Sequence, residues 1–486
     1  MNENIQDETK KIGREIFSLI GHEVPSLFDR KTWNGRLSEW VMKNEALKVP
    51  LFRFVDVLPC LKTDSLVVKM LNEYFTDIPD NPFLHGLGRL SAMLPHVAAK
   101  TLNSAVESMA SQFIGGRDEY DTLTVLQKLR KEGIACTVDL LGEAVLSDSE
   151  AFYHANRYHR LLELLAPQVN KWSEIPILDY DNHGRIPVLD VSIKISSFYS
   201  QIDPKNWDTS IRKIKEALVP LIKLATELNV SVTLDMESFY FKDLTIAVFQ
   251  GLFDDIPELR FAGLVLQAYL PDTRSDLLSL LKWAKKIKKR IGVRLVKGAY
   301  WDYETVINQQ KGWPIPVFMN KEETDYNYEE LTRVLLENTD FIRPAIATHN
   351  VRSISHAMAV ATSLGLQTNA LEFQMIYGMA EPVRQAIRRM NYRLRAYTPI
   401  GELIPGMAYL IRRLLENTSN ESFLRKSFSE STPVDELLKA PELSIQQKSV
   451  ESFTPEFRNE PSVDFSKLDN RKLMEDALRR GQKAFG

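Results

Sequence analysis

The segment YLIRRLLENTSNESFLR (residues 409–425) combines two adjacent arginines with a glutamate, a set that could bind a small carboxylate. An α-helix advances by about 100° per residue, so four apolar side chains would share one face: Leu410, Ile411, Leu414 and Leu415. Arg412, Arg413 and Glu416 would share the opposite face. That face is either an ordinary solvated surface or a guanidinium clamp for an anion, in which Glu416 orients one arginine. The segment alone leaves both interpretations open.

Polar residues at the ends of predicted strands form a second candidate set. Lys194 in VSIKIS could be a Schiff-base nucleophile, a fixed cation for an anionic ligand, or half of a structural ion pair. Asp235 in VTLDME could orient a ligand or pair with a neighbouring cation. His349 in IATHN would by default be a core or loop histidine, but its neighbours Thr348 and Asn350 favour polar contacts with a ligand.

The most specific segment is RLVKGAYWD (residues 294–302), where cations and aromatic residues crowd one predicted strand end. Arg294 is expected to point inward. Gly298 and Ala299 permit close approach to the backbone, and Tyr300 and Trp301 offer flat apolar surfaces. A conformational role would explain the glycine but not this concentration of cations and aromatic rings.

The elements that would position these residues begin near residue 133, where short apolar runs alternate with longer helical stretches. We expect eight strands, with the sequences IACTVDLL, VLDVSIKI, VSVTLD, FAGLVLQ, IGVRLV, RPAIATH, ALEFQM and YRLRAY. Eight such βα units predict an α/β fold, a (β/α)8 TIM-type barrel.

Alternation within these strands predicts which side chains face the barrel axis. In VSIKIS, Val191, Ile193 and Ile195 share one side, expected to face the outer helices, while Ser192 and Lys194 share the other. The same pattern places a set of polar residues near strand carboxyl ends: Asp139, Gln267, Arg294, Thr348 or His349, Gln374 and Tyr397. Barrels of this kind carry their active sites there.

Three regions are expected along the 486 residues. Residues 1–125 show helical periodicity and would form an arm or lid, and residues 126–426 would form the barrel. Residues 427–486 contain a stretch rich in Ser, Pro, Glu and Lys that reads as a linker, followed by a short helical stretch.

Composition narrows the functional classes. With 61 basic and 64 acidic residues, the chain has no polycationic character for binding nucleic acid. Two cysteines cannot make a disulfide framework, and the eight histidines show no metal-binding spacing. No signal peptide or membrane span is evident, so we expect a cytoplasmic protein, with brief contact at the inner face of the membrane left open.

Nine segments carry a family pattern in order between about residues 130 and 425. They are DLLGEA (139–144), VSIKISS (191–197), TLDME (233–237), LVLQAY (264–269), RLVKGAYWD (294–302), ATHN (347–350), EFQMIYGM (372–379), RAYTPIG (395–401) and RRLLENTSNESF (412–423). Together they resemble the proline dehydrogenase module of bifunctional proline utilization A flavoproteins. The resemblance implies an FAD-dependent oxidoreductase of proline catabolism, which oxidises L-proline to Δ1-pyrroline-5-carboxylate and passes electrons to a membrane quinone.

Transferred by position, the resemblance assigns site residues. The substrate side would comprise Lys194, Arg412 and Arg413 on the proline carboxylate, Glu143 pairing with Arg412 as a gate, Tyr300, Tyr397 and Leu295 on the ring, and Asp235 in support. The flavin would be met by Asp235, Gln267, Arg294, Val296, Lys297, Gly298, Ala299, Trp301, Lys321, Thr348, His349, Asn350, Gln374 and Glu416. Physical chemistry agrees, because a lysine and two guanidinium groups can hold a carboxylate.

Two features depart from the family pattern. FRNEPSVDF (457–465) resembles the start of the aldehyde dehydrogenase module that usually follows, so we expect a truncated start of that module or a natural single-module form. Residues 1–40 lack the basic strand of the DNA-binding domain that some members carry. Two other functional classes remain open, a barrel aldolase or lyase that uses Lys194 covalently and a non-catalytic imino-acid sensor.

Overall fold

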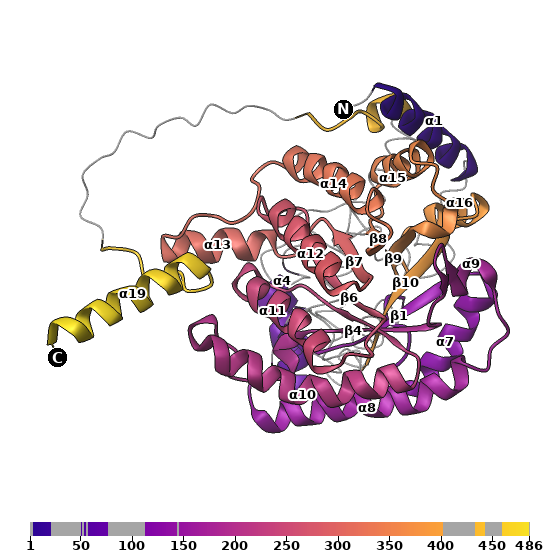
Figure 1. Ribbon diagram of the computed structural model, residues 1–486. Coiled ribbons are helices and arrows are strands. Elements are labelled where there is room, and N and C mark those ends of the chain that lie inside the picture. The colour runs from indigo at the N-terminus through magenta and orange to yellow at the C-terminus, as the bar shows by residue number, and fades with distance from the viewer. Residues whose placement is uncertain are drawn as a thin grey trace. The chain divides into compact units, whose positions relative to one another are not determined.

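The computed structural model describes residues 3–20, 50, 53–54, 57–75, 112–142, 145–401, 433–442 and 459–485. Eight parallel strands within these ranges close into a barrel in the order β1-β10-β9-β8-β7-β6-β5-β4 (Figure 1). Their bounds are β1 Ala135–Leu140, β4 Leu189–Ile193, β5 Ser231–Leu234, β6 Ala262–Gln267, β7 Ile291–Val296, β8 Ile342–Ala347, β9 Glu372–Ile376 and β10 Arg393–Ile400. The predicted (β/α)8 barrel is therefore confirmed, and each predicted strand overlaps one of these eight.

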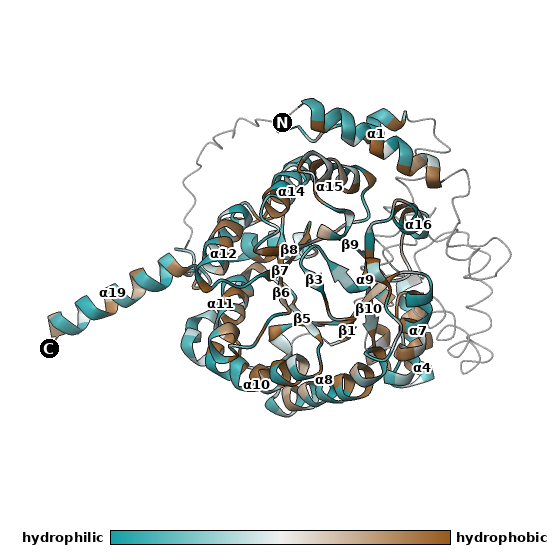
Figure 2. Ribbon diagram, turned by 45° about the vertical axis from the view of Figure 1, so that its right-hand side comes forward, coloured by the Kyte–Doolittle hydropathy of each residue, from teal (hydrophilic) through white to brown (hydrophobic). Residues whose placement is uncertain are grey.

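Helices alternate with the barrel strands along the chain after β1, and others precede β1. The longer ones are α1 Glu3–Ile20, α4 Asp64–Phe75, α7 Glu119–Lys131, α8 Asp148–Val169, α10 Trp207–Glu227, α11 Phe239–Asp255, α12 Thr273–Ile287, α13 Trp301–Lys311, α14 Lys321–Leu336, α15 Val351–Ser363, α16 Glu381–Arg389 and α19 Leu468–Phe485. Single turns are η1 Leu58–Cys60, α9 Pro176–Asp179, η2 Ile195–Ser197, η3 Pro204–Asn206, η4 Thr368–Ala370 and α18 Val434–Leu437. Figure 2 shows α8, α10, α11, α12, α14 and α15 arranged around the strands they cover.

A short hairpin, β2 Tyr180–Asp181 and β3 Gly184–Arg185, pairs antiparallel and does not belong to the barrel. The sequence analysis did not predict it. Arg290 anchors it, because its guanidinium donates to Asp181 and Asn182.

Both faces of β1, β4 and β6 are buried, as expected for a parallel barrel covered by helices. In β4, Val191 and Ile193 are each only 1% exposed. The helix α10 turns its apolar stripe inward and buries Ile214, Leu218 and Leu221 completely. Each such side chain contributes about 1.5–3 kcal/mol of hydrophobic stabilisation.

Side-chain caps define where several helices begin. Asp118 accepts from the backbone N–H groups of Tyr120 and Asp121 at the start of α7. Ser147 caps α8 and Asn350 caps α15 in the same manner. These caps satisfy backbone donors that a helix start otherwise leaves without partners.

The described chain forms two compact units. One contains residues 1–13, 143–374 and 438–486, and the other contains residues 14–142 and 375–437. In the second unit, Phe54, Leu58 and Val67 pack in one apolar cluster with Phe113 and Met379. The boundaries predicted above, 1–125, 126–426 and 427–486, remain predictions.

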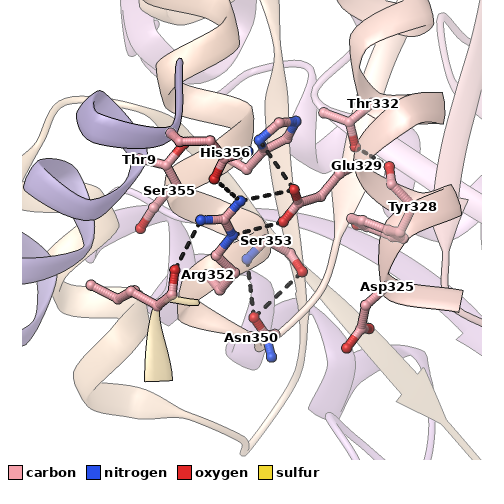
Figure 3. Close-up of polar contacts among 12 residues, drawn as sticks. Thr9, Asp325, Tyr328, Glu329, Thr332, Asn350, Arg352, Ser353, Ser355 and His356 are labelled. Atoms are coloured by element: carbon pink, nitrogen blue, oxygen red, sulfur yellow. Dashed lines mark hydrogen bonds and ion pairs between the residues drawn. The ribbon is translucent and has the colours of Figure 1, made fainter. Parts of the chain in front are cut away.

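A buried polar cluster in the first unit joins segments far apart in the sequence (Figure 3). Arg352 of α15 donates two hydrogen bonds, at 2.8 and 3.0 Å, to the carboxylate of Glu329 on α14. Its remaining donors reach the side chain of Gln6 in α1 at 2.6 Å and the carbonyl of Leu438 at 2.9 Å. The imidazole of His356 lies 3.4 Å from the same carboxylate. One arginine therefore fastens both α1 and the segment around residue 438 to two barrel helices.

Candidate active site at the carboxyl ends of the strands

Arg294, Asp235 and Ser192 form a buried polar cluster from three strands or strand ends. The Nη1 atom of Arg294 donates to Asp235 Oδ1 at 2.7 Å and to Ser192 Oγ at 2.9 Å. Ser192 in turn donates to the same carboxylate oxygen at 3.1 Å. Ser192 and Arg294 were expected to face the barrel axis, and the structure brings both to the carboxylate of Asp235.

Lys194 joins this cluster at the end of β4. Its Nζ atom lies 3.5 Å from Asp235 Oδ2, and both side chains are largely buried. Lys194 and Arg294 thus share the carboxylate of Asp235. This sharing holds two cations from different strands or strand ends close to one another. A lysine held in an ion pair fits the role of a fixed cation better than that of a covalent nucleophile.

Asp190 is a member of the cluster that the sequence analysis missed. Its carboxylate lies 3.6 Å from Arg294 Nη2 and accepts a hydrogen bond from Thr233 at 3.2 Å. Asp190 precedes Ser192 and Lys194 by two and four residues, so strand alternation places all three on one side. That spacing was the signal that could have identified it.

His154 of α8 is a buried titratable group close to the cluster. Its ring packs edge-on against Tyr158 and Phe198 at centroid distances of 5.2 and 6.0 Å. Burial, together with the positive charges of Arg157 and Lys194, lowers the pKa of His154 to about 4. The imidazole is therefore neutral near pH 7.

Gln267 and Gln374 each have a buried amide oxygen that lacks a partner among the described residues. Gln267 uses its amide nitrogen on the carbonyl of Glu237 at 3.0 Å, and Gln374 uses its own on Glu372 at 2.7 Å. The strand registers Gln267↔Val296 and Ala347↔Gln374 place both glutamines near one level of the barrel. Because a buried acceptor left without a donor costs about 1–3 kcal/mol, a bound ring with N–H donors fits this level.

The loop after β7 depends on Gly298. Its φ is +132°, and a Cβ atom built there would lie 2.4 Å from the ring of Tyr269. The loop is held to the previous strand end, because Tyr269 N donates to Lys297 O at 2.8 Å. A glycine is required on both conformational and steric grounds.

Lys297 and Lys321 share the carboxylate of Asp325 on α14. Burial raises the pKa of the Asp325 carboxyl, but the two ammonium groups outweigh this effect and hold the pKa below its usual value. Lys321 itself remains 73% exposed. Both lysines were predicted to meet the cofactor. The sequence analysis did not name Asp325, although its i,i+4 spacing from Lys321 was visible.

Other predicted residues of this loop take different positions. Trp301 is 39% exposed and donates from Nε1 to the carbonyl of Phe318 at 2.8 Å. Tyr300 is half-buried, Ala299 is exposed and Val296 is half-buried. Leu295 is fully buried and alternates with Arg294 along β7, which places it on the side of the outer helices. The structure does not bring Leu295 to the cluster, and its contact with substrate remains a prediction.

The end of β8 presents the predicted residues Thr348, His349 and Asn350. Thr348 is buried, and its backbone N–H donates to Gln374 O at 3.2 Å. Asn350 uses its side-chain oxygen to cap α15, accepting from Ser353 N at 3.0 Å. His349 is half-buried.

Several predicted residues are not placed relative to this cluster. Tyr397 on β10 is half-buried, and its carbonyl accepts from Tyr377 N at 2.9 Å within the second unit. Glu143, Arg412, Arg413 and Glu416 lie outside the described residues, so the proposed clamp and gate remain predictions.

Two further observations concern the described part of the chain alone. None of its helices has the length and apolar character that crossing a bilayer requires. Its histidine, cysteine, aspartate and glutamate residues form no group of three or more that could hold a metal ion.

Comparison with known families decides how this geometry is to be read. Residues 122–426 match the family model described as proline dehydrogenase, which covers the barrel strands and the cluster. The chain belongs to the proline dehydrogenase family. This match confirms the resemblance stated from the sequence. Enzymes of this family are oxidoreductases. Residues 6–113 match a second model, the proline utilization A N-terminal domain.

Individual proline dehydrogenase relatives agree with the family match. The bifunctional protein PutA of Escherichia coli is 29% identical over 361 residues, 72% of this chain and 26% of that protein. Proline dehydrogenase 2 of Bacillus subtilis is 29% identical over 320 residues, 66% of this chain and 90% of that protein. A crystal structure of proline utilization A from Bdellovibrio bacteriovorus, inactivated by N-propargylglycine, is 44% identical with a TM-score of 0.88. It is matched by 99% of this chain, which spans 49% of that one.

Proposed function

We propose that this chain oxidises L-proline to Δ1-pyrroline-5-carboxylate, with FAD as the immediate electron acceptor and a membrane quinone as the later one. The observation that carries the proposal is the buried cluster in which Asp235 pairs with both Lys194 and Arg294 at the strand ends of a proline dehydrogenase family chain. The Bdellovibrio relative is inactivated by N-propargylglycine, an N-substituted amino acid, which supports an amino-acid substrate.

Lys194 would hold the proline carboxylate. Its ammonium is oriented by Asp235 and lies at a strand end, where a second negative group can approach from the barrel mouth. The predicted arginines Arg412 and Arg413 would complete the clamp with charge-assisted hydrogen bonds. Fixing the carboxylate fixes the direction of the ring, so oriented binding would make the reaction effectively unimolecular.

The residues at the upper level of the barrel fit a flavin. The amide oxygens of Gln267 and Gln374, which have no partner among the described residues, can accept hydrogen bonds from N–H groups of the cofactor, and Gly298 lets the backbone approach a flat ring. Lys297 and Lys321, held by Asp325, supply positive charge for an anionic part of the cofactor. FAD, when bound, would supply the two-electron acceptor for the hydride removed from the carbon next to the proline nitrogen.

Arg294 would stabilise the negative charge that develops on the cofactor when the hydride reaches it. Its orientation is fixed before the reaction by Asp235 and Ser192, so little reorganisation is needed. No side chain needs to act as a general base, because the proline nitrogen can lose its proton to water. Electron transfer to quinone and a brief contact with the membrane surface complete the proposal.

Two experiments test the function against its alternatives. Purified protein supplied with FAD should reduce an added quinone only when proline is present, and Lys194→Met should raise the KM for proline at least ~10-fold. Borohydride trapping with substrate should leave no mass adduct on Lys194. An adduct there would establish the lyase alternative, and flavin-free protein that binds proline without turnover would establish the sensor.

A further inference from the structure

We propose that Glu304 is a positioning residue that locks the loop after β5 to the loop after β7, so that both halves of the proposed site keep one geometry. The inference rests on the proposed function and adds to it a residue that does not touch the substrate. Glu304 lies in the first turn of α13 and is 3% exposed.

The carboxylate of Glu304 caps a helix other than its own. Its Oε1 atom accepts from the backbone N–H of Phe239, the first residue of α11, at 2.6 Å. Ser238, the residue at the N-cap position of α11, makes no side-chain capping bond. A carboxylate at a helix start also interacts favourably with the helix dipole. Glu304 therefore supplies from α13 the cap that α11 lacks locally.

The start of α11 carries one half of the proposed site. Asp235 and Glu237 lie in the four residues that separate β5 from α11. Glu237 accepts from the hydroxyl of Ser196 at 2.6 Å, and its carbonyl accepts from Gln267 at 3.0 Å. A shift of the α11 terminus would therefore reach the shared carboxylate of Asp235 and the amide of Gln267.

The start of α13 carries the other half. The backbone N–H of Glu304 donates to the carbonyl of Tyr300 at 2.8 Å, immediately after the segment that contains Lys297 and Gly298. Asn308 holds Glu304 from within α13, since its amide nitrogen donates to the Glu304 carbonyl at 2.7 Å. One side chain thus connects the segment after Asp235 with the segment after Arg294.

A glutamine at this position provides a conservative comparison. Burial raises the pKa of the Glu304 carboxyl, while the Phe239 amide and Asn308 oppose the shift. The amide oxygen of a glutamine can accept the same bond from Phe239 N, whereas an alanine removes the bond and leaves the N–H buried. The arrangement of the loops after β5 and β7 should therefore persist in Glu304→Gln and be lost in Glu304→Ala.

The test measures proline oxidation by the whole chain, normalised to bound FAD by visible absorbance, together with the thermal unfolding midpoint. Glu304→Ala should lower kcat/KM per bound FAD by about 10–100-fold, mainly through kcat, because small misplacement of reacting groups has effects of that size. Glu304→Gln should stay within about threefold of wild type. Gln310→Ala, on the exposed side of the same helix, should match wild type.

The outcomes separate this role from the proposed function. Wild-type protein that binds FAD without oxidising proline would refute the function. Active wild-type protein together with an unchanged kcat/KM per bound FAD in Glu304→Ala would refute the positioning role alone, even with a lowered unfolding midpoint. If Glu304→Gln is as defective as Glu304→Ala, the bond to Phe239 is not the cause and the inference fails.

Discussion

Asp235 and Arg294 form a buried ion pair, with 2.7 Å between Oδ1 and Nη1, across strands β5 and β7 that are not neighbours in the sheet. The second oxygen of Asp235 lies 3.5 Å from Lys194. The cation proposed to face the cofactor and the cation proposed to hold the substrate therefore share the carboxylate of Asp235.

Asp235→Asn should weaken both stability and activity. The substitution keeps the size of the side chain but removes the carboxylate that Lys194 and Arg294 share. Because Asp190 still lies 3.6 Å from Arg294, the loss should not exceed about 3–5 kcal/mol, the cost of breaking a buried ion pair. Urea unfolding measures the loss. Asp340→Asn is the control, because Asp340 is an exposed partner of His183 and should change the free energy of unfolding by less than about 0.5 kcal/mol. Equal stabilities of the two variants would exclude the shared ion pair as a stabilising feature.

Gly298→Ala should destabilise the fold by more than the loss of glycine's backbone freedom alone would cause. The new methyl group would lie 2.4 Å from the ring of Tyr269 at φ +132°. Gly365→Ala is the matched control, since Gly365 has φ +65° and open space around it. We expect Gly298→Ala to lose about 1–3 kcal/mol more than the control and to retain less FAD on gel filtration. Similar losses in both variants would show that Tyr269 yields to the methyl group.

Arg352→Met should destabilise the fold by about 3–5 kcal/mol, because it leaves the carboxylate of Glu329 buried without its guanidinium. The double variant Arg352→Met with Glu329→Leu should recover much of that loss, since the unpaired charge is gone. Arg333→Met removes an exposed pair with Glu337 and should cost about 0–1 kcal/mol. Chemical unfolding compares the three. A double variant less stable than Arg352→Met alone would contradict this account, because it would show that the carboxylate of Glu329, which lies 3.4 Å from His356, stabilises the fold even without the guanidinium.

His154 should make the fold sensitive to acid. The pKa of His154 is about 4 in the folded chain and 6.5 for an unperturbed histidine. Between pH 6.5 and pH 4, therefore, the unfolded chain binds a proton at this residue and the folded chain does not. The contribution of neutral His154 to the free energy of unfolding is therefore complete above pH 6.5. It falls by about 3 kcal/mol as the pH decreases toward 4. His154→Phe keeps a ring against Tyr158 and Phe198 and should remove this part of the pH dependence. Parallel stability profiles of both proteins between pH 4 and 7 would contradict the assignment.

Local patterns made the barrel and much of the cluster predictable. Alternation in VSIKIS separated Ser192 and Lys194 from the apolar residues of β4, and the same rule placed Arg294 and Gln267 inward. Such patterns work because side-chain direction in a strand depends only on residue parity.

Contacts between distant segments were not predictable in this way. The sequence contains Glu304 and Phe239 but no signal that one caps the helix of the other across 65 residues. The hairpin at Tyr180–Arg185 was missed because its strands are two residues long, too short for any periodicity. Asp190 obeys the alternation rule, but it lies near the start of β4, away from the strand end where the site was predicted.

The most direct test of the proposed chemistry is the visible absorption spectrum of the purified protein during anaerobic titration with L-proline. If Lys194, Asp235 and Arg294 form a flavin-dependent proline site, the protein will show the visible absorption bands of a flavin, and these bands will bleach on addition of proline. Lys194→Met will keep the bands but need much more proline to bleach them. Wild-type protein that carries FAD and keeps its full absorbance at saturating proline would contradict the account.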